Sequence, residues 1–199
     1  MQAARGTSLS HRDSSADHPI RHSTSRGRAT GVFAGVALVA YAVDVSTKVL
    51  VVERLSGNAD VPLVGNVLVL HLTRNPGAAF STGTGYTVLL TCIAITAVLV
   101  VLHLSRRVGD LVWAVALGLL LAGVSGNLTD RLFREPGPLR GHVIDFLMLP
   151  HWPVFNVADM CINVAAGLIL LQAFRGIRID GGRTDDKADD KATDVGTEA

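Results

Sequence analysis

The sequence predicts an all-α integral membrane protein: a four-transmembrane-helix bundle with a small extracytoplasmic, β-containing loop. The first observation is that the 199 residues are 49% hydrophobic, with a mean hydropathy of +0.39. The second is that the apolar residues gather between residues 31 and 174 in four runs, each near the roughly 20 residues that cross a bilayer. Buried helices of a soluble protein are the rival interpretation, but so short a chain has little surface to cover four such runs.

The expected spans are about residues 31–52, 86–104, 111–129 and 154–174. Residues 75–105 carry no Asp, Glu, Lys or Arg, and residues 154–174 would form a helix about 31 Å long. The first span contains Asp44 and Lys48, follows a long polar leader and lacks an A-x-A cleavage site after it. These features favour a retained anchor over a cleaved signal peptide.

Polar, charged ends set the expected domain boundaries. Residues 1–29 and 177–199 have few apolar residues, so we expect a disordered N-terminal extension and a disordered C-terminal tail around a membrane domain of residues 30–176. Arginines gather before the first span, between the second and third, and after the fourth, which places both termini in the cytoplasm. Loops 53–85 and 130–153 then lie outside, and no basic, aromatic-interleaved patch indicates nucleic-acid binding.

The unusual polar residues converge on one side of this topology. An Asp at mid-bilayer costs about 2.5–3.5 kcal/mol, so a chain that keeps one usually has a use for it. Placed on the four spans, the polar groups lie at the outer ends of the helices or in the outer loops. The group comprises Asp44, Lys48, Asn75, Asn127, Asp130, Arg131, Asp145, Asn156 and Asp159. We therefore predict one site at the outer membrane interface.

The polar residues of the first and last spans also have purely structural interpretations. Asp44 and Lys48 are spaced i,i+4 and so share a helix face, where they could form a purely structural ion pair. Asn156-x-x-Asp159 has the spacing of a capping box, in which Asn156 caps the last helix and Asp159 reaches back to its amide.

The middle of the chain has similar alternatives. Asp130 beside Arg131 indicates an internal ion pair, with Asn127 as a hydrogen-bonding brace. The "NPGAAF" stretch (75–80) could be only a turn at Pro76, and its small residues, Gly77 first among them, also let backbone approach a substrate closely. Cys92 and Cys161 lie in apolar runs and show no metal-ligand spacing.

Carboxyl pairs suggest a chemistry for the site. Two carboxyl groups placed close together share one proton, because both cannot ionise comfortably. The ionised group can take a proton from water while the protonated group donates to a carbonyl oxygen, which is how aspartic proteases hydrolyse amides. From the residues alone, the choice among Asp130, Asp145 and Asp159 stays open.

Five stretches carry a resemblance to a known family. They are "DVSTK" (44–48), "RNPGAAFS" (74–81), "GNLTDR" (126–131), "VIDF" (143–146) and "FNVAD" (155–159). In this order, and with four spans between them, they resemble lipoprotein signal peptidase, also called signal peptidase II. The resemblance covers about residues 31–174.

The resemblance implies a membrane aspartic endopeptidase in the bacterial cytoplasmic (inner) membrane, with its site at the extracytoplasmic face. It would act as a monomer without cofactor or metal and remove signal peptides from diacylglyceryl-modified prolipoproteins, cutting before the lipidated Cys. Membrane lipid and a globomycin-type inhibitor are further implied partners. The catalytic pair falls on Asp145 and Asp159. The implied substrate-binding or site-supporting residues are Asp44, Lys48, Asn75, Gly77, Asn127, Asp130, Arg131 and Asn156.

Some features depart from the family pattern, and two other functions are alternatives to a peptidase. The stretch "LFREPGPLRGH" (132–142) is longer than the family leads us to expect, and "VLVLHLT" (67–73) alternates enough to predict a short strand pair lying on the membrane. A small proton-coupled transporter is the alternative function, but it predicts an acid near mid-bilayer with access from both sides. A non-catalytic scaffold would tolerate Asn at both Asp145 and Asp159.

Overall fold

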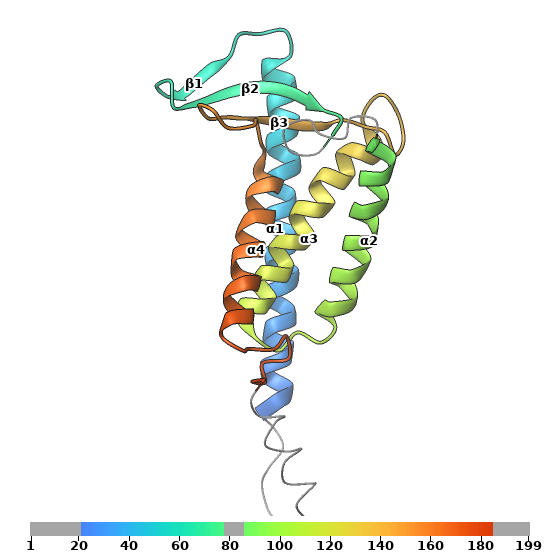
Figure 1. Cartoon of the computed structure of the whole chain (residues 1–199), viewed down its shortest axis with the longest axis vertical. Coiled ribbons are helices and arrows are strands. Elements are labelled where there is room, and N and C mark those ends of the chain that lie inside the picture. Colours follow the sequence, from blue (N-terminus) through green and yellow to red (C-terminus); the bar gives the residue numbers. More distant parts are fainter. Residues whose placement is uncertain (1–20, 78–85, 185–199) are drawn as a thin grey trace, which may run out of the picture.

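The computed structural model describes residues 21–77 and 86–184. Within these residues it has four helices, each long and apolar enough to cross a membrane, and a three-stranded sheet across one end of the bundle (Figure 1). The elements in chain order are α1 (Arg21–Leu55), β1 (Val61–Val64), β2 (Leu68–Asn75), α2 (Thr87–Ser105), α3 (Leu111–Phe133), β3 (Val143–Met148) and α4 (Val157–Phe174). The predicted fold class is confirmed.

The helix ends differ from the expected spans where polar residues find partners. Helix α1 begins ten residues before the expected position 31, and α3 runs four residues past 129 because its last polar side chains are paired inside the bundle. Helix α4 begins at Val157 rather than 154, because Asn156 caps it. The expected extensions lie outside the described residues for 1–20 and 185–199.

Residues 177–184, expected in the disordered tail, instead form a turn beneath the bundle. Ile177 bridges to Arg183, and the Ile179 carbonyl accepts a hydrogen bond from the Gly109 amide at 2.9 Å. The indole Nε1 of Trp113 donates to the Ile177 carbonyl at 2.9 Å. This segment therefore fastens the end of α4 to the α2–α3 turn, at the end of the bundle opposite the sheet.

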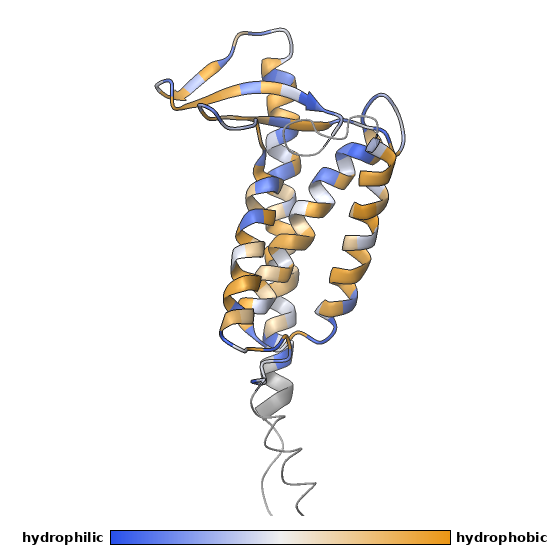
Figure 2. Cartoon of the chain, in the orientation of Figure 1, coloured by the Kyte–Doolittle hydropathy of each residue, from blue (hydrophilic) through white to orange (hydrophobic). Residues whose placement is uncertain are grey.

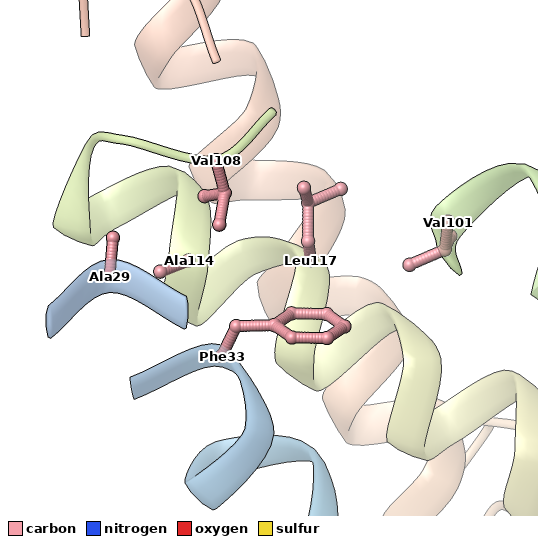
Figure 3. Close-up of a cluster of buried hydrophobic side chains, with 6 residues drawn as sticks. All are labelled: Ala29, Phe33, Val101, Val108, Ala114 and Leu117. Carbon is pink, nitrogen blue, oxygen red and sulfur yellow. The ribbon is translucent and has the colours of Figure 1, made fainter. Parts of the chain in front are cut away.

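Helix α3 is the centre of the bundle and packs against α1, α2 and α4. Figure 2 shows hydrophobic residues along the helices and hydrophilic residues toward the two ends of the bundle. Figure 3 shows one apolar cluster, in which Phe33 of α1, Leu117 of α3 and Val101 of α2 come together. A Cβ on Gly123 would lie 2.5 Å from the Ala158 carbonyl oxygen, so glycine permits the close approach of α3 and α4.

The sheet brings distant polar residues together. Strand β2 pairs antiparallel with both β1 and β3, and opposite β3 its register places Asn75 against Val143 and Thr73 against Asp145. The predicted strand pair within loop 53–85 is confirmed. The third strand, which carries Asp145, was not expected. That the sheet lies on the membrane stays a prediction, with which the exposed apolar side chains of β1 are compatible.

Candidate active site

Asp159 stands in the first turn of α4, where both of its carboxylate oxygens accept hydrogen bonds. Oδ2 accepts from the Asn156 amide at 3.1 Å, while the Asn156 side-chain oxygen accepts from the Asp159 amide at 3.0 Å. This reciprocal pair is the capping box that the spacing predicts. The second oxygen, Oδ1, accepts from Asn127 Nδ2 of α3 at 2.9 Å. The carboxylate thus caps its helix and also reaches a side chain of α3.

Asp145 lies on β3 and is 2% exposed. Asn75 Nδ2, on β2, donates to its Oδ2 at 2.9 Å, and Asn156 Nδ2 donates to its Oδ1 at 2.6 Å. The link between β3 and α4 folds back through a bridge between Leu147 and Phe155. Asn156 therefore contacts both acids: its side chain donates to Asp145, and its backbone amide donates to Asp159.

The two carboxyl groups line one cavity of about 380 Å³ where the sheet meets the bundle. Arg131 Nη2 donates to the Gly77 carbonyl at 3.0 Å and so holds the end of β2 against α3. The other lining residues are Asn75, Asn127, Val143, Trp152, Pro153, Val154, Phe155, Ile162 and Asn163. The cavity is thus polar on the α3 and β2 side and apolar along the segment that leads into α4.

Burial raises the pKa of Asp145 from 3.8 to about 6. The hydrogen bond from Asn75 opposes this rise, the negative charge of Asp159 adds to it, and the hydrogen bond from Asn156 and the positive charge of Lys48 lower the pKa. A carboxyl group with such a pKa keeps its proton at mildly acidic pH, as one member of an acid pair must do.

A pH-dependent difference in stability follows from this raised pKa. Because the folded protein holds the Asp145 proton more tightly than the unfolded chain, this carboxyl group favours folding below pH 4 and loses that contribution as pH rises through about 6. Between pH 4 and 8, wild type should lose about 3 kcal/mol of unfolding free energy relative to Asp145→Asn. Unfolding of the two proteins in detergent across this range tests the prediction, and parallel pH curves would contradict it.

Behind the cavity lies a buried ionic network centred on Lys48, which is 1% exposed. Its Nζ lies 2.9 Å from Asp44 Oδ2, 2.9 Å from Asp130 Oδ2 and 2.9 Å from Asn127 Oδ1. Asp44 Oδ1 accepts from the Ala158 amide at 2.8 Å, and Asp130 Oδ2 accepts from the Ile144 amide at 3.2 Å. Each acid therefore holds the residue that directly precedes a cavity-lining Asp.

The network confirms one predicted ion pair and corrects another. Asp44 and Lys48 are paired as their i,i+4 spacing predicts. Asp130 pairs with Lys48 and with Arg134 rather than with Arg131. Neighbouring residues on a helix point in different directions, whereas Arg134 is one turn further along the same face. Arg131 turns instead to Gly77 and the cavity.

The structure divides the expected site residues into two layers. Asn75, Gly77, Asn127, Arg131, Asp145 and Asp159 line the cavity, while Asp44, Lys48, Asp130 and Asn156 are buried behind it. The part of "NPGAAF" after Gly77 lies outside the described residues. Sequence reasoning missed Arg134, although its i,i+4 spacing from Asp130 was readable. It also missed the cavity-lining role of residues 152–155. Among the described residues, no group of three or more His, Cys, Asp or Glu is arranged to hold a metal.

Comparison with known proteins decides the family. The sequence profile described as signal peptidase (SPase) II matches residues 36–175, which is most of the chain. The chain belongs to the signal peptidase II family. Similar members include the lipoprotein signal peptidase of Leifsonia xyli subsp. xyli, 46% identical over 170 residues that cover 85% of this chain and 78% of the relative. That of Mycobacterium avium is 52% identical over 136 residues, covering 68% and 74%.

Solved structures support the fold of this signal peptidase II. A bacterial membrane enzyme solved by the in meso method at 2.3 Å resolution superposes with a TM-score of 0.66 at 24% identity, over 73% of this chain and 88% of that one. A second bacterial membrane enzyme, at 1.9 Å resolution, gives a TM-score of 0.63 at 25% identity, over 72% and 92%. The chain is a multi-pass membrane aspartic peptidase, as the resemblance implies, and the transporter alternative is not supported.

Proposed function

We propose that this signal peptidase II removes signal peptides from diacylglyceryl-modified prolipoproteins, cutting before the lipidated Cys, with Asp145 and Asp159 as its catalytic pair. The observation that carries the assignment of the pair is that these two carboxyl groups line one cavity and share the hydrogen-bonding residue Asn156. Family membership supports the reaction, and the geometry supports the choice of residues. Asp130, the third candidate, does not line the cavity.

In the proposed reaction, Asp145 begins protonated and Asp159 ionised. Asp159 sits at the N-terminus of α4, where the helix dipole and two N–H donors favour a negative charge. It takes a proton from a water molecule as the water oxygen attacks the scissile carbonyl carbon. Asp145 gives its proton to the carbonyl oxygen. As the C–N bond breaks, Asp159 gives the proton it took from water to the departing nitrogen, and Asp145 takes back a proton from a hydroxyl of the diol intermediate. The signal peptide is left with a carboxyl terminus and the lipidated Cys with a free amine, and both acids return to their starting states.

Groups around the pair are suited to hold an extended peptide. Arg131 Nε is buried and has no hydrogen-bond partner among the described residues, so it can donate to a substrate carbonyl. Asn75 and Asn127 place polar side chains beside the pair, and Gly77 lines the same cavity. A diacylglyceryl group stays in lipid, so its peptide bond reaches the protein at the depth where the helices meet the sheet.

The proposal includes an orientation. The described ends of the chain lie together at the end of the bundle opposite the sheet (Figure 1), where Arg106, Arg107, Arg175 and Arg178 are also found. The positive-inside rule then places both termini in the cytoplasm and the cavity at the outer face of the bacterial cytoplasmic membrane. We further propose that the protein works as a monomer and that globomycin-type inhibitors occupy this cavity in competition with substrate.

Cleavage of a purified prolipoprotein tests the proposed function. In detergent with added lipid, the protein should cut the diacylglyceryl-modified substrate on the amino side of the modified Cys, as read by mass spectrometry. The unmodified substrate should be cut at least about 100-fold more slowly, because it lacks the lipid anchor that contributes binding energy in the transition state. Equal rates on both substrates, or a cut elsewhere, would contradict the proposal.

A further inference from the structure

Lys48 contacts neither acid of the pair, yet it has three polar partners in the layer behind them. Its buried ammonium group has three N–H bonds and three oxygen neighbours at 2.9 Å, from Asp44, Asp130 and Asn127. The two carboxylates balance its charge. The contact with Asn127 has a different effect. It joins the ammonium group, which can only donate, to a side-chain amide that can present either its oxygen or its NH₂ group.

An Asn side-chain amide has a carbonyl oxygen that accepts and an NH₂ group that donates, and a 180° flip exchanges them. An ammonium group can only donate, so Lys48 requires the Asn127 oxygen to face it. Asn156 Nδ2 adds a second donor to the same oxygen at 3.2 Å. With its oxygen held on this side, the Asn127 amide must present Nδ2 to Asp159 Oδ1, at 2.9 Å.

We propose that Lys48 is a positioning residue that fixes the orientation of the Asn127 amide, so that Asn127 always donates its hydrogen bond to Asp159. The proposal rests on the proposed function, because it assigns Asp159 the task of accepting a proton from water. Without Lys48, the amide can flip and present its oxygen to Asp159, which favours a protonated carboxyl group. Lys48 thus keeps the base ready without touching substrate.

The balance of charges around the acid pair explains why the orientation of the Asn127 amide matters for the protonation of the two acids. The charged groups of the site and its network are Asp159, Asp145 of β3, Asp130 and Arg131 of α3, Arg134 directly after α3, and Asp44 and Lys48 of α1. These are four carboxyl groups, Asp159 included, against three cations, so the region is neutral when one carboxyl group holds a proton. The Asn127 hydrogen bond favours Asp159 as an ionised member and leaves that proton to Asp145.

The test compares Asp44→Asn/Lys48→Met with Asp44→Asn alone. The double variant removes one positive and one negative charge, so the net charge of the site is kept and no lone carboxylate replaces the Asp44–Lys48 pair. Asn at 44 can still accept from the Ala158 amide. Relative both to wild type, which has the same net charge, and to Asp44→Asn, the double variant should lower kcat on the order of 10- to 100-fold, the range for one hydrogen bond to a charged group. KM should stay unchanged.

The pH profile separates positioning from a general loss of structure. Losing a donor disfavours the ionised form of Asp159, so the acidic limb of kcat against pH should move to higher pH in Asp44→Asn/Lys48→Met. Tyr41→Phe serves as the matched control, because Tyr41 hydrogen-bonds Thr129 at 2.9 Å between the same two helices and takes no part in the hydrogen bonds of Lys48 or Asn127. Its kcat and its profile should match wild type. Lys48→Arg keeps a cationic donor and should restore the wild-type limb.

Asn127→Ala provides an independent route if the double variant does not fold. It removes the same hydrogen bond and should shift the acidic limb in the same direction. Where the double variant does fold, adding Asp44→Asn/Lys48→Met to Asn127→Ala should produce no further shift. An unshifted limb in Asn127→Ala, or a uniform loss of kcat without a shift in the double variant, would overturn the proposal while the proposed function stands. A wild-type protein that cuts no modified prolipoprotein would overturn both.

Discussion

Asp159→Asn is expected to abolish cleavage of the lipid-modified substrate while leaving the protein folded. Asn has the shape of Asp, and its side-chain oxygen can still accept the Asn156 amide, so the capping box keeps that half of its exchange. It cannot take a proton from water. Loss of the general base should lower kcat at least about a thousandfold.

A matched folding measurement makes this result interpretable. The midpoint of thermal unfolding in detergent should fall by only a few degrees in Asp159→Asn, because the group replaced is partly exposed and keeps its hydrogen bond with the Asn156 amide. A folded variant that retained a tenth of the wild-type rate would show that Asp159 is not the base.

Gly126→Ala adds a single methyl group and is expected to cause a large loss of unfolding free energy. A Cβ at this position of α3 would collide with Asp44 Oδ2 and lie 3.0 Å from Asp44 Cγ. Asp44 cannot move aside freely, because it holds Lys48 and the Ala158 amide at the same time. Relief therefore requires α1 and α3 to separate or the buried pair to break. We expect a loss of about 3 kcal/mol or more in unfolding free energy.

Gly167→Ala supplies the control for that substitution. Gly167 lies within α4, and nothing lies within 4 Å of an added Cβ, so this variant should unfold close to wild type. Unfolding can be followed with a thiol-reactive dye, since Cys161 is buried and Cys92 exposed. If Cys161 of Gly126→Ala became labelled at the same temperature as Cys161 of wild type, that result would contradict the packing described around Asp44.

Sequence reasoning predicted best where one local signal decides the structure. Helix α2 falls within a residue of its expected bounds because its apolar run is uninterrupted. The Asn156–Asp159 capping box and the Asp44–Lys48 pair follow from spacings of three and four residues. The convergence of polar residues at one depth also follows from topology alone.

Long-range contacts explain what the sequence could not provide. Strand β3 is six residues long and is specified by its partner β2, about 70 residues earlier in the chain, so "VIDF" alone indicated only a loop. The same pairing brings Asn75 to Asp145. The roles of the Ile144 and Ala158 backbone amides carry no side-chain signal at all, because any residue at those positions other than proline has an amide to donate.

Comparing Asp145→Asn with Asp130→Asn tests the central claim most directly. Both acids are buried on the same side of the bundle, but only Asp145 lines the cavity, while Asp130 holds Lys48, Arg134 and the Ile144 amide. The measurement is the cleavage rate of the diacylglyceryl-modified prolipoprotein per folded molecule. We predict no detectable cleavage by Asp145→Asn and residual cleavage by whatever fraction of Asp130→Asn folds. If folded Asp145→Asn still cuts the substrate while folded Asp130→Asn does not, the catalytic pair is Asp130 and Asp159, and Asp145 is not a catalytic residue.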